Sequence, residues 1–129
     1  EFAASPNPWM ADFGVECLRR LKTGECIPDR VTLRPYGIRL ASACTLLGMD
    51  CEPLYGLGRL LETALAAFHP VILGYTNGCI GYIPDTAALC EGGYECESYL
   101  WGPWSGPFLP HLEHPIEAAA RNLLKTFSV

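Results

Sequence analysis

Two apolar runs separated by an amphipathic stretch constrain the fold of this chain more than any other feature. Ile38–Met49 and Val71–Tyr75 are almost continuously apolar and have the length of buried strands. Between them, leucines recur at helical spacing from Leu54 to Phe68. Because a strand, a helix and a strand in this order form a right-handed crossover, the two strands are expected to be parallel neighbours. The pattern predicts an α/β or α+β fold, with helices packed on a small mixed sheet in one compact layered domain.

The N-terminal part of the chain adds a helix and a strand to this prediction. Residues 1–9 contain two prolines and few periodic apolar positions, so they are expected to be an irregular lead-in or a remnant of cloning. Residues 10–129 then form the predicted single domain. Apolar residues at near-helical intervals predict a helix over Met10–Lys22. Arg30–Arg34 alternates between polar and apolar side chains, which is typical of a strand, and Pro35–Gly37 predicts a turn after it.

Further signals lie in the second half of the chain. Asp50–Pro53 resembles the start of a helix, because a carboxylate can accept the free N–H groups of the first turn and proline fits there. Asn77-Gly78 predicts a turn, and Asp85–Cys90 predicts one or two helical turns. The loop Trp101–Trp104 is expected to be either an aromatic lip facing a ligand or a loop anchored in the core. The predicted last helix, Pro115–Phe127, is amphipathic, and its inner positions are Ile116, Ala119, Ala120, Leu123, Leu124 and Phe127.

Charge and cysteine content exclude several classes of protein. Nine Lys and Arg residues against fourteen Asp and Glu residues give a net charge of −5 without a basic cluster, so nucleic-acid binding is not expected. The apolar runs are too short for a transmembrane helix, and the chain is expected to be soluble. Seven cysteines without a C-x-x-C pair predict neither a complete disulfide framework nor a zinc ribbon. We interpret them as buried reduced thiols, which favour a cytoplasmic location, although the sequence leaves the localisation undetermined.

The predicted parallel strands place two loops at the same edge of the sheet. One follows the first strand at Cys51 and Glu52, and the other runs from Asn77 to Tyr82. Ligand sites of open α/β sheets lie at the carboxyl ends of the strands, so this edge is the predicted functional site. Two alternatives remain open on pattern alone. Glu52 could be a helix-capping carboxylate, and the glycine-rich second loop could be a hairpin with packing tyrosines.

Two segments near this edge resemble a stretch shared by neutral and alkaline ceramidase-like proteins, above all the shorter bacterial members. They are Gly74–Pro84 (GYTNGCIGYIP) and Glu91–Glu95 (EGGYE). Leu47–Leu54 (LGMDCEPL) resembles that family's Pro-Gly-Glu element, with Asp50-Cys51 in place of Pro-Gly. The resemblance spans residues 38 to 99, about half of the chain.

The resemblance implies a zinc-dependent amidohydrolase site. Glu52 matches the family's glutamate ligand and Tyr82 its tyrosine ligand, while two histidine ligands belong to an N-terminal region of that family. A zinc ion with an open position lowers the pKa of its bound water to roughly 7, so that the hydroxide attacks an amide or ester carbonyl. Tyr75 and Asn77 are the candidates for placing the substrate or the oxyanion.

The chain has three histidines, and none lies in a motif that matches the family's histidine ligands. His69 precedes Pro70 at a predicted helix-to-strand junction and is interpreted as structural. His111 and His114 are three residues apart before the last helix, a spacing compatible with metal ligation. The remaining zinc ligands are therefore expected to be His111, His114, Cys79 or side chains of a second copy of the chain.

These observations lead to one hypothesis and two alternatives. The first is a metal-dependent hydrolase that cleaves an amide or ester bond, or a phosphoester, of a small-molecule or lipid-like substrate. The second is a non-catalytic domain or fragment that keeps the fold and associates as a homodimer through exposed apolar surface. The third is a Cys-His hydrolase, with Cys79 or Cys51 as the thiolate and His69 or His114 as the base.

Overall fold

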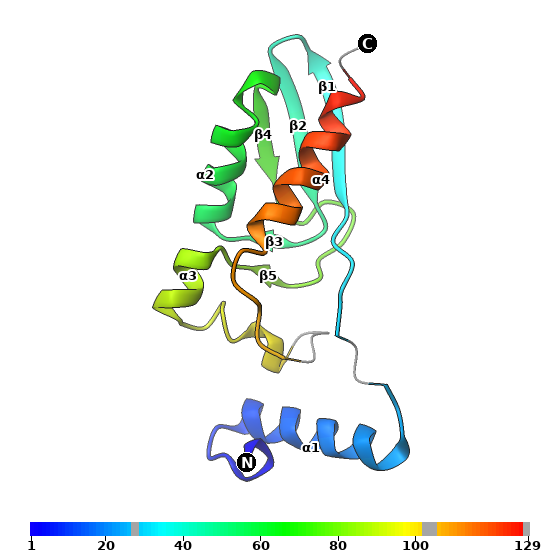
Figure 1. Ribbon diagram of the computed structural model, residues 1–129, viewed down its shortest axis with the longest axis vertical. Coiled ribbons are helices and arrows are strands. Elements are labelled where there is room, and N and C mark those ends of the chain that lie inside the picture. The colour runs from blue at the N-terminus through cyan, green and yellow to red at the C-terminus, as the bar shows by residue number, and fades with distance from the viewer. Residues whose placement is uncertain (27–28, 102–105, 128–129) are drawn as a thin grey trace.

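A three-stranded mixed sheet with two helices on one face forms the centre of the molecule (Figure 1). The computed structural model describes residues 1–26, 29–101 and 106–127. The predicted α/β class with a small mixed sheet is confirmed. The helices are α1 (Pro8–Thr23), α2 (Tyr55–Ala64), α3 (Thr86–Glu91) and α4 (Glu113–Lys125), with short 3-10 helices at Phe2–Ala4, Ala66–Phe68 and Ser98–Leu100. The strands are β1 (Pro35–Ala41), β2 (Cys44–Met49), β3 (Glu52–Pro53), β4 (Pro70–Leu73) and β5 (Tyr82–Ile83).

The main sheet joins its strands in the order β1-β2-β4. β1 and β2 are antiparallel, with Ile38 opposite Leu46, and β2 and β4 are parallel, with Leu46 opposite Val71. Since α2 connects β2 to β4, the predicted crossover between parallel neighbours is confirmed. A separate parallel pair joins β3 to β5 and sets Glu52 directly opposite Tyr82.

The boundaries of the first two strands differ from the prediction. Arg30–Arg34 forms no strand, and β1 begins at Pro35, inside the predicted turn. The apolar run Ile38–Met49 is not one strand, because the chain turns back at Ser42-Ala43 and forms the β1–β2 hairpin. A single serine is a weak turn signal inside an apolar run, so the hydrophobic pattern hides this turn.

The predicted helix start at Asp50–Pro53 is also wrong. Glu52 and Pro53 form β3, and α2 begins later, at Tyr55, without a side-chain cap. The Asp50 carboxylate is buried and accepts a hydrogen bond from the Arg34 backbone N–H at 2.7 Å. Its other oxygen lies 3.4 Å from the Arg34 guanidinium. Because this carboxylate is bound to the segment before β1, it does not cap α2.

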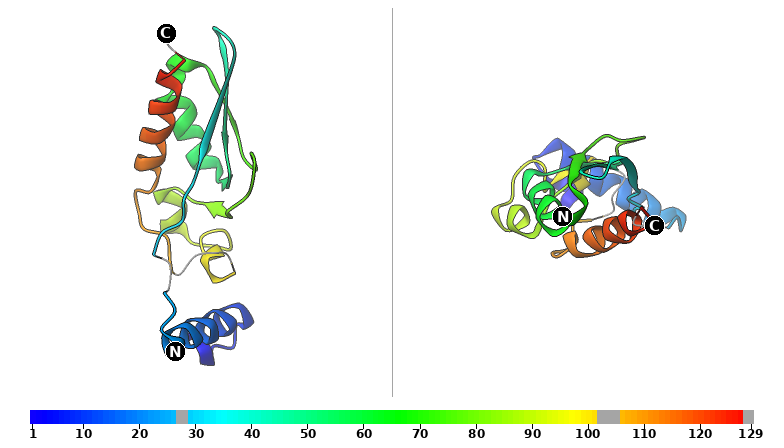
Figure 2. Two further views of the ribbon diagram at one scale, coloured as in Figure 1. Left: turned by 90° about the vertical axis from the view of Figure 1, so that its right-hand side faces the viewer. Right: turned by 90° about the horizontal axis from the view of Figure 1, so that it is seen from above.

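The core lies between the main sheet and the helices α2 and α4 (Figures 1 and 2). Successive strand side chains point to opposite faces, and in β2 Leu47 and Met49 point inward and are fully buried. Gly37 of β1 lies beneath α4, where an added Cβ would be 2.8 Å from the Phe127 ring, so close packing requires glycine there. Ala119, a predicted inner position, is exposed instead. The other buried members of the core are Cys51, Leu57, Leu61, Leu65, Ile83, Ile116, Ala120 and Leu124.

Helix α1 lies apart from the main sheet and its two covering helices (Figure 1). It begins at Pro8 with an Asn7 side-chain cap, and Phe2–Ala4 forms a 3-10 helix, so the first nine residues contain more helix than the pattern predicts. In the part of the chain that the structure describes, no α1 residue belongs to the core. Aromatic pairs with centroids 5.8 Å apart attach α1 to the rest of the molecule: Trp9 with Trp101, and Phe13 with Tyr99.

Each helix within residues 1–26, 29–101 and 106–127 is too short or too polar to cross a lipid bilayer.

Candidate functional site

The strand pair β3–β5 places Glu52 beside Tyr82. The two residues are register partners, and the Glu52 backbone N–H donates to the carbonyl of the residue before Tyr82 at 2.9 Å. The loop between β4 and β5 is bound along Met49–Cys51 by three more backbone hydrogen bonds, whose donors are Tyr75, Thr76 and Ile80. Tyr75 and Asn77 have φ values of 53° and 60° in the left-handed region, which lets this loop change direction twice within three residues.

A carboxylate and two phenols meet at this point. The Tyr75 hydroxyl donates a hydrogen bond to Oε2 of Glu52. This bond, together with burial and the charge of Glu52, raises the pKa of Tyr75 to about 12. Burial and the charge of Glu52 also raise the pKa of Tyr82. In the metal-free protein at neutral pH, both phenols are therefore protonated and can donate hydrogen bonds to a carboxylate or a substrate oxygen.

Glu52 and Tyr75 line a hollow of about 340 Å³ whose walls also include the apolar side chains of Leu54 and Ile72. We name it the polar hollow for its charged residues, Glu52, Arg59 and Glu62. Its other wall belongs to the first turns of α2 and includes Tyr55, Arg59 and Glu62. The Arg59 guanidinium pairs with the Glu62 carboxylate and remains largely exposed. The hollow thus offers two carboxylates, the phenols of Tyr55 and Tyr75, and a guanidinium to a small ligand, while Tyr82 is not among its lining residues. Sequence analysis does not identify Tyr55 or Arg59, because both occupy polar-face positions of a helix that resemble ordinary solvent-exposed positions.

Asn77 and Cys79 lie in the same loop and are exposed. Cys79 is close enough to Tyr75 and Cys51 for its charge to contribute to the raised pKa of both. The Asn77 side chain makes no hydrogen bond to another described residue, and its backbone supplies one of the left-handed positions of the loop. In the structure, Tyr75 and Cys79 therefore lie near Glu52 and Tyr82. Asn77 contributes to the turn of the loop through its backbone.

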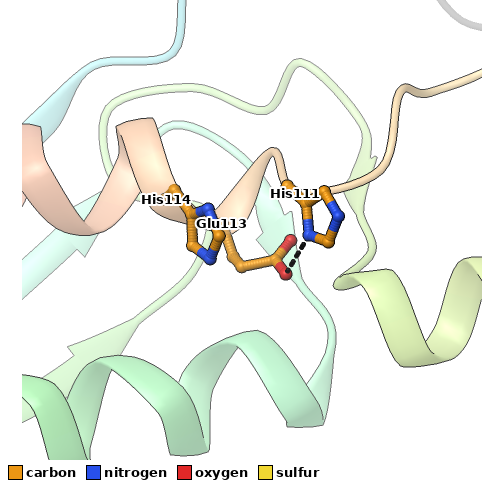
Figure 3. A group of neighbouring side chains, drawn as sticks. All are labelled: His111, Glu113 and His114. Carbon is orange, nitrogen blue, oxygen red and sulfur yellow. Dashed lines mark ion pairs between the residues drawn. The ribbon is translucent and has the colours of Figure 1, made fainter.

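His111 and His114 lie with Glu113 at the start of α4 (Figure 3). Each residue offers one potential ligand atom, a ring nitrogen or a carboxylate oxygen, and these three atoms lie within 4.8 Å of one another. Oε1 of the buried Glu113 accepts a hydrogen bond from the Thr86 hydroxyl at 2.7 Å. Burial acts to raise the pKa of Glu113, but hydrogen bonds from Thr86 and from its own backbone, with the charges of the two imidazoles, lower this pKa overall. Sequence analysis identifies the two histidines and misses Glu113 and Thr86.

The four predicted metal ligands fall into two places in the structure. Over the described ranges, one group of three His, Cys, Asp or Glu side chains is close enough to share an ion; it contains His111, Glu113 and His114 but not Glu52. Glu52 and Tyr82 fit two oxygen positions of the zinc site that the ceramidase-like resemblance implies, because their side chains meet. The two nitrogen positions of that site are not filled by His111 and His114.

No hydrogen bond joins the described residues of the Cys-His alternative. Neither Cys51 nor Cys79 hydrogen-bonds to His69 or His114, all four of which are described. Cys51 is fully buried, and burial raises the pKa of its thiol to about 12. A thiol that stays protonated at neutral pH is a poor nucleophile. His69 has a φ of 48°, and its carbonyl accepts a hydrogen bond from the Thr45 N–H at 3.1 Å, where the chain enters β4.

Trp101 is the described residue of the predicted Trp101–Trp104 loop; residues 102–105 lie outside the described residues. Its ring stacks on Tyr94 with centroids 4.7 Å apart. Tyr94 also meets Tyr82 edge to face, with centroids 5.9 Å apart. A chain of ring contacts therefore connects Trp101 to the Tyr82 side of the candidate site.

Comparisons with protein-family models, with curated proteins and with solved structures give no match to this chain. The ceramidase-like resemblance therefore stays a prediction that rests on Leu47–Leu54, Gly74–Pro84 and Glu91–Glu95.

Proposed function

We propose that this chain provides the carboxylate and phenol side of a metal-dependent hydrolase site that cleaves an amide or ester bond. The observation that carries the proposal is the meeting of Glu52, Tyr75 and Tyr82 beside a polar hollow. Carboxylate oxygens are among the ligands of catalytic zinc sites, which keep one position open for water or substrate. The resemblance of Gly74–Pro84 to ceramidase-like proteins supports the same chemistry, and a phosphoester is the alternative substrate bond.

Each side chain has a defined role in this proposal. Glu52 and Tyr82 would hold the ion through oxygen, and the neighbouring Cys79 or side chains of a second copy would supply its other ligands. When bound, the ion supplies a water molecule whose pKa is roughly 7. Tyr75, a protonated phenol, donates a hydrogen bond to the carbonyl oxygen on which negative charge develops. Arg59 orients an anionic or strongly polar group of the substrate in the hollow.

An apolar hollow of about 690 Å³ supports a substrate with a hydrocarbon part. Ile80 and Ile83, which flank Tyr82 in the chain, line it, so the hollow lies beside the strand that carries the proposed ligand. Its volume is within the range of roughly 300–1,000 Å³ that is usual for small-molecule sites. Other lining residues are Leu33, Phe108, Leu112 and Ile116. The proposed substrate class is therefore a small or lipid-like amide or ester.

The proposal is tested by hydrolysis of nitrophenyl esters and nitroanilides with short and long acyl chains, in the presence of Zn²⁺. We expect Glu52→Gln and Tyr82→Phe each to lower kcat/KM by at least about 100-fold, since the loss of a ligand's outer-shell partner alone costs roughly 10–100-fold. Tyr75→Phe should lower kcat more than it raises KM. Removal of zinc by a chelator should abolish turnover, and adding zinc back should restore it.

Matched controls keep this test specific. Glu91→Gln and Tyr36→Phe remove the same chemical groups at positions that do not line the polar hollow, and they should leave kcat/KM unchanged. Wild-type protein without zinc-dependent turnover of any substrate in the panel would contradict the proposal. So would turnover that survives both Glu52→Gln and Tyr82→Phe.

A homodimeric interaction domain is the second candidate, and a specific observation favours it. The helices α2 and α4 lie on one face of the main sheet (Figure 2). The opposite face exposes apolar side chains of β1 and β4, among them Ile38 and Val71. Exposed apolar patches of this kind are normally covered by a partner.

A further inference from the structure

The segment that enters α4 carries a second group of metal-ligand side chains, separate from Glu52 and Tyr82. His111, Glu113 and His114 supply three ligand atoms within 4.8 Å of one another (Figure 3). The two imidazole rings are nearly parallel, with an angle of 7° between their planes and centroids 5.3 Å apart. The neighbouring Leu112 and Pro115 line the apolar hollow instead. The three polar side chains of this segment, those of His111, Glu113 and His114, therefore lie close together, although Leu112 separates His111 from Glu113 in the chain.

Glu113 is buried in an arrangement that leaves one of its oxygens without a protein partner. The residue is 6% exposed, and its Oε1 accepts a hydrogen bond from the Thr86 hydroxyl at 2.7 Å. The Thr86 oxygen in turn accepts a hydrogen bond from the His111 backbone N–H at 2.7 Å. Oε2 of Glu113 is buried and has no hydrogen-bond partner among the described residues. Because buried polar atoms are nearly always paired, this oxygen needs a further partner, which is an ion or a water molecule.

We infer that His111, Glu113 and His114 bind a divalent transition-metal ion, with Zn²⁺ as the best match. Two imidazole nitrogens and one carboxylate oxygen are the donor set of open zinc sites in which water takes the fourth position. Imidazole ligands favour zinc, copper or nickel over magnesium and calcium, which prefer oxygen. Oε2 is the oxygen left free for an ion, because Oε1 accepts the Thr86 hydrogen bond and lies 3.9 Å from Nδ1 of His111.

The surroundings of the three side chains match what a metal site needs. Ligating carboxylates are usually held by an outer hydrogen bond, and Thr86 provides it for Glu113. With metal–ligand bonds of about 2.0–2.2 Å, ligand atoms of a tetrahedral site lie roughly 3.4 Å apart, so the imidazoles must move inward. They have the freedom to do so, since His114 is exposed and the His111 side chain is 65% exposed. The buried carboxylate is thus the fixed ligand, and the histidines are the adjustable ones.

Zinc titration of the whole 129-residue chain against a chromophoric zinc indicator tests this site. All variants carry Glu52→Gln and Tyr82→Phe as a common background, so failure of this site and failure of the proposed hydrolase site are distinguishable. We expect His111→Ala, His114→Ala and Glu113→Gln each to weaken zinc binding by at least about 100-fold. Thr86→Val should weaken binding by roughly 10–100-fold, the usual effect of losing an outer-shell partner.

Two matched controls and one spectroscopic readout complete the experiment. His69→Ala and Thr63→Val lie outside the three-residue group and should leave zinc affinity unchanged. In NMR spectra, Zn²⁺ should shift the imidazole resonances of His111 and His114 but not those of His69. Circular dichroism verifies that each variant is folded, and the exposed His114 keeps the test decisive if Glu113→Gln fails to fold.

Two results would overturn the inference. One is the absence of zinc binding to the folded background protein. The other is an equal zinc affinity of the background protein and of its His111→Ala and His114→Ala variants. This result would show that thiolates or other groups hold the ion.

Discussion

Cys51 and Glu52 are neighbours in the chain but have opposite surroundings. The Cys51 side chain is fully buried in the core, while Glu52 lies at the polar hollow and accepts a hydrogen bond from Tyr75. This difference arises because consecutive residues of extended chain point to opposite faces. One residue therefore contributes to stability and the next to the candidate site, and each can be tested without the other.

Cys51 is predicted to make the fold sensitive to alkaline pH. Burial raises the pKa of its thiol from 9.0 to about 12, so between these values the unfolded chain loses a proton that the folded chain keeps. The stabilisation is complete below pH 9 and is lost as the pH rises towards 12. In urea denaturation at a series of pH values, the free energy of unfolding should therefore fall less steeply in Cys51→Ala than in the wild type. Parallel pH profiles of the two proteins would contradict this prediction.

At the scale of elements, α2 holds two glycines with different neighbours. An added Cβ at Gly56 would lie 1.9 Å from Oδ2 of Asp85, whereas nothing lies within 4 Å of the corresponding position at Gly58. Asp85 is the N-cap of α3 and accepts hydrogen bonds from the N–H groups of Ala87 and Ala88 at 2.9 and 3.0 Å. The close approach of α2 to the start of α3 therefore requires glycine at position 56 but not at position 58.

The two glycines form a matched pair of substitutions. Gly58→Ala should raise the free energy of unfolding by about 0.5–1 kcal/mol, because glycine is unfavourable inside a helix. Gly56→Ala gains the same helix propensity but displaces the Asp85 cap, whose loss costs about 0.5–2 kcal/mol. Added repulsion between the new methyl group and the carboxylate should make Gly56→Ala a net loss. Equal stability of the two variants in urea denaturation would show that Asp85 moves aside freely.

At the scale of the whole molecule, the described helices cover one face of the main sheet and leave the other face without a helix. α2 and α4 pack on one face of the sheet (Figure 2), the face that contains Leu47. The register places Ile38, Leu46 and Val71 in one row on the opposite face. Ile38 is 58% and Val71 45% exposed. This row carries no charge, so two copies, each with a net charge of −5, can meet here without bringing like charges together.

Self-association through this face is the corresponding prediction. Sedimentation of the wild-type chain should show a dimer that dissociates on dilution, and Ile38→Glu should shift the equilibrium to the monomer, because the buried charge would be unpaired. Leu21→Glu is the matched control, since Leu21 is also more than half exposed, at 66%, but lies on α1. A wild-type chain that stays monomeric at high concentration would contradict the prediction. So would a dimer that is lost in the Leu21→Glu variant but kept in the Ile38→Glu variant.

Sequence patterns were sufficient to predict the helices and strands that a local repeat of apolar residues determines. The helical spacing of leucines predicts α2, the short apolar run predicts β4, and the crossover rule predicts that β4 is parallel to β2. The helical turns after Asp85 follow from its capping side chain in the same way. The edge rule also directs attention to Glu52 and Tyr82, which the structure places opposite each other.

Tertiary structure alone decided the features that depend on partners distant in the sequence. Asp50 is bound by Arg34, 16 residues away, and not by the helix that follows it; Glu113 is bound by Thr86, 27 residues away. The separation of His111 and His114 from Glu52 has the same origin. A hydrophobic period records which face of an element is buried, because burial repeats along that element. It does not record which other segment covers that face, and a site built from several segments becomes visible only when they are packed together.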